Sequence, residues 1–204
     1  MSYSQDHSFR RGETNLPYNP SISPQQIELL RIHTPRLILR PVRAEDASNV
    51  FTEFTKHVAE HMTPEPANNL EDTVEFLQGA IEARKTGTDL QLVIMDPTEQ
   101  EFLGLIGLHT RYGRQTPEIG IWLKADAWGR GLGKAAVHSL IEWANQNMQF
   151  EYIVYPVSET NYPSRNIAES YKVTPVRSFT TTRSWAGPLT LVEYHIPYGS
   201  LPGN

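Results

Sequence analysis

A glycine-rich segment with two basic residues carries the strongest chemical signal in the sequence. It reads Gly129, Arg130, Gly131, Leu132, Gly133 and Lys134. Glycines let a backbone approach a ligand closely, and the free N–H groups at the start of a helix favour an anion. Because the segment lies between a predicted strand and an amphipathic helix, we predict that it binds a phosphate or pyrophosphate.

Two familiar nucleotide-binding loops fit this segment poorly. A Walker loop needs four residues before its Gly-Lys pair and then Ser or Thr, whereas three residues separate Gly129 from Gly133 and Ala135 follows Lys134. A Rossmann loop follows directly on a strand, and its acidic residue ends the next strand; here Glu151 would begin it. A glycine turn that only caps the helix remains an alternative.

A second motif could bind a metal. His57, Glu60 and His61 fit the H-x-x-E-H pattern of some zinc peptidases. Pro64 would end the helix at once and no third ligand is evident, so a solvent-facing helix end is the favoured interpretation and no metal is expected. The absence of cysteine excludes disulfides, Cys-ligated zinc and a cysteine nucleophile.

The overall composition limits the partners of the protein. The chain has 204 residues, with 18 basic and 23 acidic side chains, which argues against a nucleic-acid-binding protein. Its longest apolar stretch, Phe102–Leu108, is far shorter than the ~20 residues that span a membrane. The N-terminus lacks the apolar core of a signal peptide, so we expect a cytoplasmic protein without a membrane partner.

Hydrophobic periodicity predicts the elements that position these residues. Strands are expected at 36–42, 90–95, 102–110, 118–123, 151–157, 176–182 and 190–196, and helices at 44–61, 70–84, 131–148 and 164–171. The fold class is therefore α/β (α+β), with a mixed, mostly antiparallel central sheet of about seven strands and helices on both faces. Residues 1–25 should form a flexible arm, and residues 26–204 a single domain.

The glycine segment and three further blocks resemble the GNAT superfamily of acyl-CoA N-acyltransferases. The blocks are Thr34–Ala47, Leu103–Leu108, Gly129–Gly133 and Glu159–Ser170. Their order and spacing resemble the branch of ribosomal-protein N-terminal acetyltransferases, and the match runs from about Arg31 to Tyr198. The resemblance implies a GNAT-like fold and acetyl-CoA as co-substrate.

The resemblance also implies a cofactor site. The expected cofactor-binding residues are Ile121, Trp122, Leu123, Trp128, Gly129, Arg130, Gly131, Leu132, Gly133, Lys134, Asn161 and Ser164. In the family, the strand backbone at 121–123 binds the pantetheine arm and the glycine loop binds the pyrophosphate. Ala168 stands where many members carry a catalytic tyrosine, so no tyrosine acid is assigned.

Amide formation needs a neutral amine, although an alkyl amine with a pKa of about 10 is mostly protonated at neutral pH. Glu118 is the first candidate for the base because it begins a strand and shares a face with Trp122 by alternation. His109 on the preceding strand is the second candidate. Ser164 is the candidate hydrogen-bond partner of the thiol. Structural roles, as a salt-bridged Glu, a hydrogen-bonded His and a helix N-cap, remain alternatives.

The predicted function is that of an N-acetyltransferase that transfers an acetyl group directly from acetyl-CoA to a primary amine in a ternary complex. The acceptor is a small molecule or a protein N-terminus, and the resemblance implies that its site involves residues 61–70 and 181–190. A non-catalytic acyl-CoA-binding module is the alternative. A monomer or a homodimer is expected.

Overall fold

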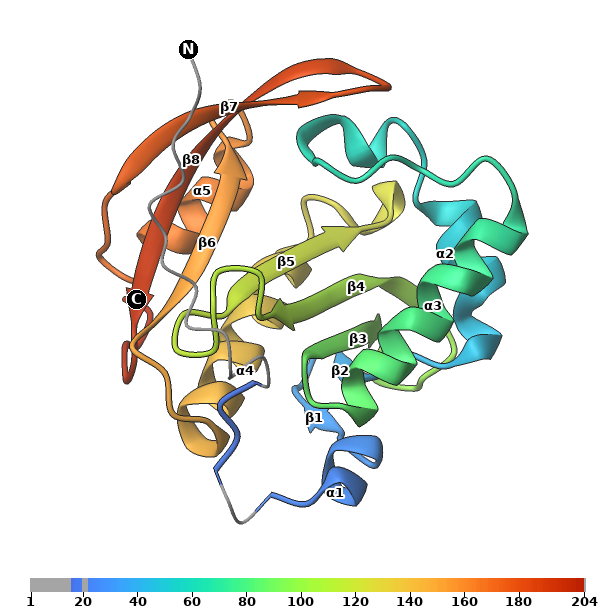
Figure 1. Ribbon diagram of the computed structural model, residues 1–204, viewed down its shortest axis with the longest axis horizontal. Coiled ribbons are helices and arrows are strands. Elements are labelled where there is room, and N and C mark those ends of the chain that lie inside the picture. Colours follow the sequence, from blue (N-terminus) through green and yellow to red (C-terminus); the bar gives the residue numbers. More distant parts are fainter. Residues whose placement is uncertain (1–15, 20–21, 204) are drawn as a thin grey trace.

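The fold is built on one eight-stranded sheet. The computed structural model describes residues 16–19 and 22–203, and its strand order is β1-β2-β3-β4-β5-β6-β8-β7 (Figure 1). Neighbouring strands are antiparallel except for β5 and β6, which are parallel. The predicted mixed, mostly antiparallel sheet is therefore confirmed, and the additional strand is the two-residue β1.

The elements lie close to their predicted positions. The strands are β1 Ile32–His33, β2 Ile38–Pro41, β3 Asp89–Met95, β4 Phe102–His109, β5 Glu118–Leu123, β6 Tyr152–Ser158, β7 Arg177–Arg183 and β8 Gly187–Pro197. The helices are α1 Pro24–Glu28, α2 Ala47–Glu53, α3 Leu70–Lys85, α4 Leu132–Asn147 and α5 Tyr162–Glu169, with short 3-10 turns η1 Ala44–Asp46, η2 Val58–His61 and η3 Ala125–Ala127. None of the helices in the described ranges has the length and hydrophobicity needed to cross a membrane.

Helices cover both faces of the sheet because its central strands are apolar on both sides. On β3, Leu92 and Ile94 pack into the core that includes α4, whereas Val93 and Met95 pack into the core under α2 and α3. The predicted apolar stripe of α4 is buried throughout, at Leu132, Ala136, Leu140 and Ala144. The two cores hold the central strands β3, β4 and β5 in place. Residues at the ends of these strands contribute to the site described below.

The predicted helix over 44–61 is wrong in its middle. Helix α2 ends at Glu53, and Phe54 leaves the helical conformation with φ −82° and ψ 69°. Its ring packs on Trp122 of β5, with ring centroids 4.9 Å apart. This tertiary contact outweighs the local helical pattern, and between Phe54 and Asn69 the only helical element is the 3-10 turn η2.

Part of the predicted N-terminal arm, residues 1–15 and 20–21, lies outside the described residues. Within the remainder, Leu16 is buried and Tyr18 pairs with Met148 through an isolated bridge. Ser23 caps α1, and Ile27 packs into the core. The chain from residue 22 onward therefore already belongs to the fold.

Candidate active site

A gap between two parallel strands forms the site. Strands β5 and β6 are paired only at Glu118 and Val154, after which they diverge (Figure 1). On its other edge β5 stays paired with β4 as far as Leu123. The backbone of β5 beyond Glu118 is therefore left without a strand partner on the β6 side, where it can bind an extended ligand.

Two adjoining cavities occupy this gap. One, of about 550 Å³, lies over the end of β5 and the start of α4. The other, of about 780 Å³, lies over β4 and β5 and extends to α2 and α3. They share six lining residues, which are His61, Met62, Ile121, Trp122, Asn161 and Ser164. A ligand in the first cavity can therefore meet a ligand in the second at the middle of β5.

The smaller cavity collects the residues that the sequence predicts for the cofactor. All of them line it except Arg130, whose carbonyl accepts a hydrogen bond from Arg36 beneath the loop. Gly129 and Gly131 have φ values of 69° and 71°, which favour glycine, and Gly131 is the N-cap of α4.

The N-terminus of α4 is suited to an anion. No side chain caps it and its first turn contains no acidic residue, so the first N–H groups remain available. Lys134 lines the same cavity and adds a positive charge. Loop and helix together can therefore hold a phosphate or pyrophosphate.

Trp128 connects the loop to β5. Its Nε1 donates a hydrogen bond to the carbonyl of Leu123 at 2.9 Å. The ring of His57 lies against it, with centroids 5.0 Å apart. These contacts hold the glycine loop at a fixed distance from the open edge of β5.

Three polar side chains form a row across the sheet at the larger cavity. Strand register pairs Asp89 of β3 with His109 of β4, and His109 with Glu118 of β5. Side chains of paired residues share a face, so the row points to one side of the sheet. His109 and Glu118 line the cavity, while Asp89 supports His109 from behind.

Glu118 is buried without adequate neutralisation. Its nearest cation is Arg111, with Nη1 3.7 Å from Oε1, and its Oε2 has no hydrogen-bond partner among the described residues. Burial raises the pKa of Glu118; Arg111 and His109 lower it, and Glu193 and Asp89 raise it further. A carboxylate with these properties can accept a proton from a bound ligand.

His109 is oriented by Asp89. Its Nδ1 lies 2.8 Å from Oδ1 and 2.9 Å from Oδ2 of Asp89, so the Nδ1 proton is donated to the carboxylate. Its Nε2 leans over Gly120, where a Cβ atom would lie only 3.2 Å away. The absence of a side chain at Gly120 gives the ring access to the cavity beside Glu118.

A pair of hydroxyl groups faces the junction of the two cavities. Ser164 Oγ lies 2.9 Å from the Tyr155 hydroxyl, and burial raises the pKa of Tyr155 to about 12. Asn161 is the N-cap of α5, and its Oδ1 accepts the Ser164 N–H at 3.2 Å. The expected alternative of Ser164 as the N-cap therefore does not apply, and its hydroxyl is available to the cavity.

Glu118, His109 and Ser164, the three residues predicted for catalysis, all line the larger cavity. Sequence reasoning missed Asp89 and Tyr155. An Asp at the start of a strand, antiparallel to a strand that ends in His, was the available signal for Asp89. No local pattern distinguishes Tyr155 from a core residue.

The H-x-x-E-H motif has another structure. Residues 58–61 form the 3-10 turn η2, so His57 and His61 are not related by a turn of α-helix. His61 instead faces Thr160 across the cleft, with Nδ1 3.5 Å from Oγ1. Within the described ranges, no group of three or more His, Asp or Glu side chains is arranged to hold a metal ion.

Solved structures share this architecture. A ribosomal L7/L12 α-N-protein acetyltransferase in complex with coenzyme A is 16% identical, with a TM-score of 0.72, over 82% of this chain and 98% of that chain. A ribosomal-protein-S5-alanine acetyltransferase from Vibrio fischeri is 17% identical, with a TM-score of 0.70, over 83% and 97%. A GNAT acetyltransferase from Bacillus anthracis is 20% identical, with a TM-score of 0.71, over 83% and 99%.

Sequence comparison gives the family directly. No curated protein sequence matches the chain significantly. A family model described as the acetyltransferase (GNAT) domain matches residues 36–174, well over half of the chain. The chain therefore belongs to the GNAT acetyltransferase family and is an acyl-CoA-dependent N-acetyltransferase.

Proposed function

We propose that the enzyme transfers an acetyl group directly from acetyl-CoA to a primary amine while both are bound, with Glu118 as the general base and no metal. The observation that carries this proposal is the position of Glu118. It is a buried carboxylate with one cation at 3.7 Å and one oxygen without a hydrogen-bond partner among the described residues, where the cavity over β4 and β5 meets the open edge of β5.

The residues of the smaller cavity fit acetyl-CoA. The glycine loop, the N-terminus of α4 and Lys134 would hold the pyrophosphate, and the backbone of Ile121–Leu123 would pair with the pantetheine arm. When bound, acetyl-CoA supplies an activated acyl group on a thiol leaving group. Backbone N–H groups on the open edge of β5 are suited to stabilise negative charge on the thioester oxygen.

Glu118 would remove the proton that the amine must lose. Its raised pKa makes it a better proton acceptor than an exposed carboxylate, and its unpartnered Oε2 has room for an N–H donor. His109, with Nδ1 committed to Asp89, presents Nε2 as a second acceptor beside Glu118. Glu118 and His109 therefore offer two neighbouring acceptors for the proton that leaves the amine.

Ser164 would donate a hydrogen bond to the departing sulfur. The Tyr155 hydroxyl is buried, and Ser164 Oγ is its partner. If Ser164 donated to Tyr155, the tyrosine proton would be buried without an acceptor, which costs about 1–3 kcal/mol. Tyr155 therefore donates to Ser164, and the serine proton is free to point into the cleft.

Thermal stability and thiol release test the proposal together. Acetyl-CoA at 100 times its Kd should stabilise the fold by about 2.7 kcal/mol. Thiol release should require an amine, and initial rates should show a sequential rather than a ping-pong pattern. Stabilisation without thiol release for any amine would instead indicate the non-catalytic binding module.

A matched pair of glycine variants tests the assignment of the loop. Gly129 and Gly199 have similar φ values, 69° and 75°, and both have open space where a Cβ atom would stand. Only Gly129 lines the smaller cavity. Gly129→Ala should raise the KM for acetyl-CoA about tenfold, whereas Gly199→Ala should lower the melting temperature similarly without changing that KM. Equal KM values in both variants would place the pyrophosphate elsewhere.

A further inference from the structure

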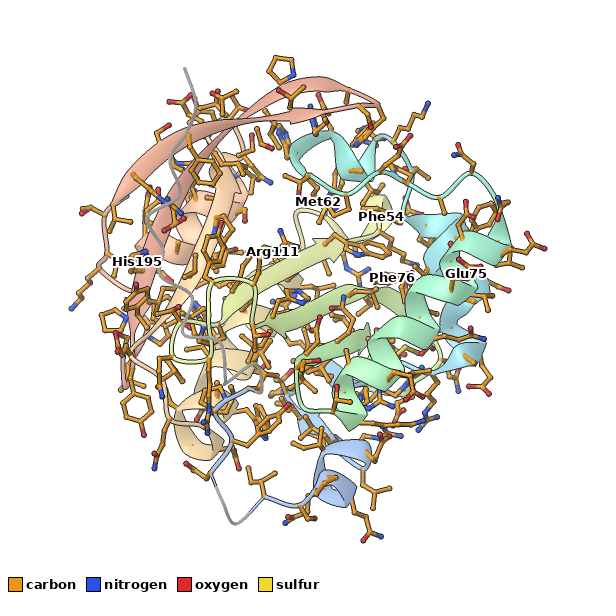
Figure 2. All side chains as sticks on the ribbon, in the orientation of Figure 1. Phe54, Met62, Glu75, Phe76, Arg111 and His195 are labelled. Carbon is orange, nitrogen blue, oxygen red and sulfur yellow. The ribbon has the colours of Figure 1, made fainter. Side chains whose placement is uncertain are left out.

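The outer part of the larger cavity is lined by aromatic side chains that are unusually exposed. Phe51 of α2 is 37% exposed and Phe76 of α3 is 50% exposed, and both line the cavity. Phe54 lies on the same wall, with its ring against Trp122. Figure 2 labels Phe54 and Phe76 on the side of the site formed by α2, α3 and β5. Exposed apolar surface in a cavity is stabilised when a ligand with an apolar group covers it.

A bridge joins two distant segments that both contribute to the lining of this cavity, through Met62 and Glu65 on one side and Thr181 on the other. Arg183, at the end of β7, donates to the carbonyls of Glu60 at 2.7 Å and of Met62 at 3.1 Å. Ser184 adds a contact to Glu65, with oxygens 3.5 Å apart. Figure 1 shows the β7–β8 hairpin reaching over the sheet towards the segment that contains η2. Because the bridge ties these two segments together, a long chain cannot pass between them unless the bridge breaks, which favours a small molecule over a polypeptide.

The charges of the cavity favour a cation. The lining side chains that carry a formal charge are the carboxylates of Glu65, Asp72 and Glu118 and the guanidinium of Arg111, and His61 and His109 also line the cavity. Negative charge therefore exceeds positive charge along the path to Glu118. A protonated amine would be attracted to this path before it loses its proton at the inner end.

We propose that the acceptor is a small primary amine on a short chain that bears an aromatic or similar apolar group. The amine would reach Glu118, and the apolar group would pack against Phe51, Phe54 and Phe76. This inference rests on the proposed function, because it assigns the amine to the cavity that holds the proposed base. It goes further by excluding polar alkyl amines and peptide N-termini as preferred acceptors.

Rates with three probes at saturating acetyl-CoA test the proposal. The probes are 2-phenylethylamine, ethanolamine and an octapeptide that begins with serine, and the readout is thiol release. We expect kcat/KM for 2-phenylethylamine to exceed that for ethanolamine by about 10–200-fold, the range that apolar pocket contacts supply. The peptide should react more slowly than 2-phenylethylamine. Equal rates for the two amines, or a preference for the peptide, would overturn the proposal.

Variants assign the preference to the aromatic wall. Phe76→Ala and Phe51→Ala should each lower kcat/KM for 2-phenylethylamine about tenfold and leave that for ethanolamine within about twofold. Leu29→Ala is the control, since Leu29 is an exposed apolar residue that lines neither cavity and lies outside the segments predicted for the acceptor. A loss of activity towards both amines in parallel would contradict a role in specificity.

Calorimetry separates the failure of this inference from the failure of the proposed function. Binding of 2-phenylethylamine to the CoA-saturated protein, weakened by Phe76→Ala but not by Leu29→Ala, would support the acceptor class even without turnover. In that case the proposed catalytic function would be wrong and the binding site correct. Turnover of other amines without binding of 2-phenylethylamine would show that the proposed acceptor class is wrong and that the proposed catalytic function is correct.

Discussion

Glu118 and Glu193 are buried glutamates with opposite surroundings. They are 7% and 3% exposed. Glu193 accepts hydrogen bonds from Arg177 through Nη2 at 2.6 Å and Nε at 3.0 Å, and its other oxygen lies 2.8 Å from His195 Nε2. Glu118 has one cation at 3.7 Å and an oxygen with no partner among the described residues.

The difference separates a carboxylate that maintains the fold from one that is available for chemistry. A buried charge is costly unless it is paired, and Glu193 meets this requirement by joining β7 to β8. Glu118 does not meet it, and it is the one of the two that lines a cavity. Under the proposed function, this oxygen accepts an N–H from the bound amine.

Glu118→Gln is expected to have the largest effect on catalysis. Removal of a general base lowers kcat about 10²–10⁴-fold. Because glutamine removes a buried charge that has only one distant, mostly exposed cation, the melting temperature should stay constant or rise, and acetyl-CoA should stabilise the variant as it does the wild type. Steady-state kinetics and a melting curve with and without acetyl-CoA measure both effects. If the variant keeps its kcat, Glu118 is not the base and the functional contrast with Glu193 is wrong. His109→Gln would then test the second candidate base.

Tyr155→Phe should have the second largest effect on kcat. The variant tests whether lacking a hydrogen-bond partner is by itself enough to mark a buried polar group as functional. Among hydroxyls the pattern is reversed, since Tyr155 is partnered by Ser164 at the cleft, while the buried Tyr171 hydroxyl has no partner among the described residues. Tyr155→Phe should lower kcat about tenfold, the equivalent of one hydrogen bond. Tyr171→Phe, the matched control, should leave kcat unchanged and stabilise the fold slightly.

A double-mutant cycle shows how Tyr155 acts. If it only orients the Ser164 hydroxyl, Tyr155→Phe should have no further effect on kcat in a Ser164→Ala background. Additive losses would mean that Tyr155 acts through packing, because a merely structural contribution does not depend on the serine.

The glycine loop and its helix were predictable because their signal is local. The alternation of Gly129 and Gly131 and the apolar stripe of α4 lie within about twenty residues, so spacing alone placed them at a helix N-terminus. The same holds for Glu118, whose position at the start of β5 follows from alternation. Both features depend on the backbone of one segment.

The acceptor side was not predictable to the same extent because its contacts join segments far apart in sequence. Arg183 meets the carbonyl of Glu60 across 123 positions, and Asp89 meets His109 only through the register of β3 and β4. Phe54 lies outside the helix that periodicity predicts for it, and its ring packs on Trp122. Periodicity carries no information about such partners, which are selected by tertiary packing.

Glu193→Gln should affect stability rather than catalysis. The variant leaves Arg177 without its carboxylate, but the Arg177 side chain is half-exposed and can be hydrated. We therefore expect a loss of about 1–2 kcal/mol, less than for a fully buried pair. Melting curves measure this loss, and kcat should stay within about twofold of the wild type. A large fall in kcat with an unchanged melting temperature would exchange the roles that we assign to the two glutamates.

Arg111→Met should have the smallest effect, confined to the pH dependence. Arg111 lowers the pKa of Glu118, so its removal should raise that pKa above its already raised value. The base is active when deprotonated, so the acid limb of kcat should move to higher pH. Since Arg111 is mostly exposed and screened by solvent, the loss of rate on that limb should be less than about threefold.

The raised pKa of Glu118 also predicts how this residue makes stability depend on pH. The raised pKa means that the folded state binds the Glu118 proton more tightly than the unfolded chain does. The contribution of Glu118 to stability should therefore be greatest below the ordinary pKa of glutamate and decrease as the pH rises through its pKa in the folded state. Arg111→Met should extend this decrease to higher pH, and Glu118→Gln should abolish it. If Arg111→Met moved neither the acid limb nor the stability profile, Glu118 would be neutralised by another group, and its contrast with Glu193 would disappear.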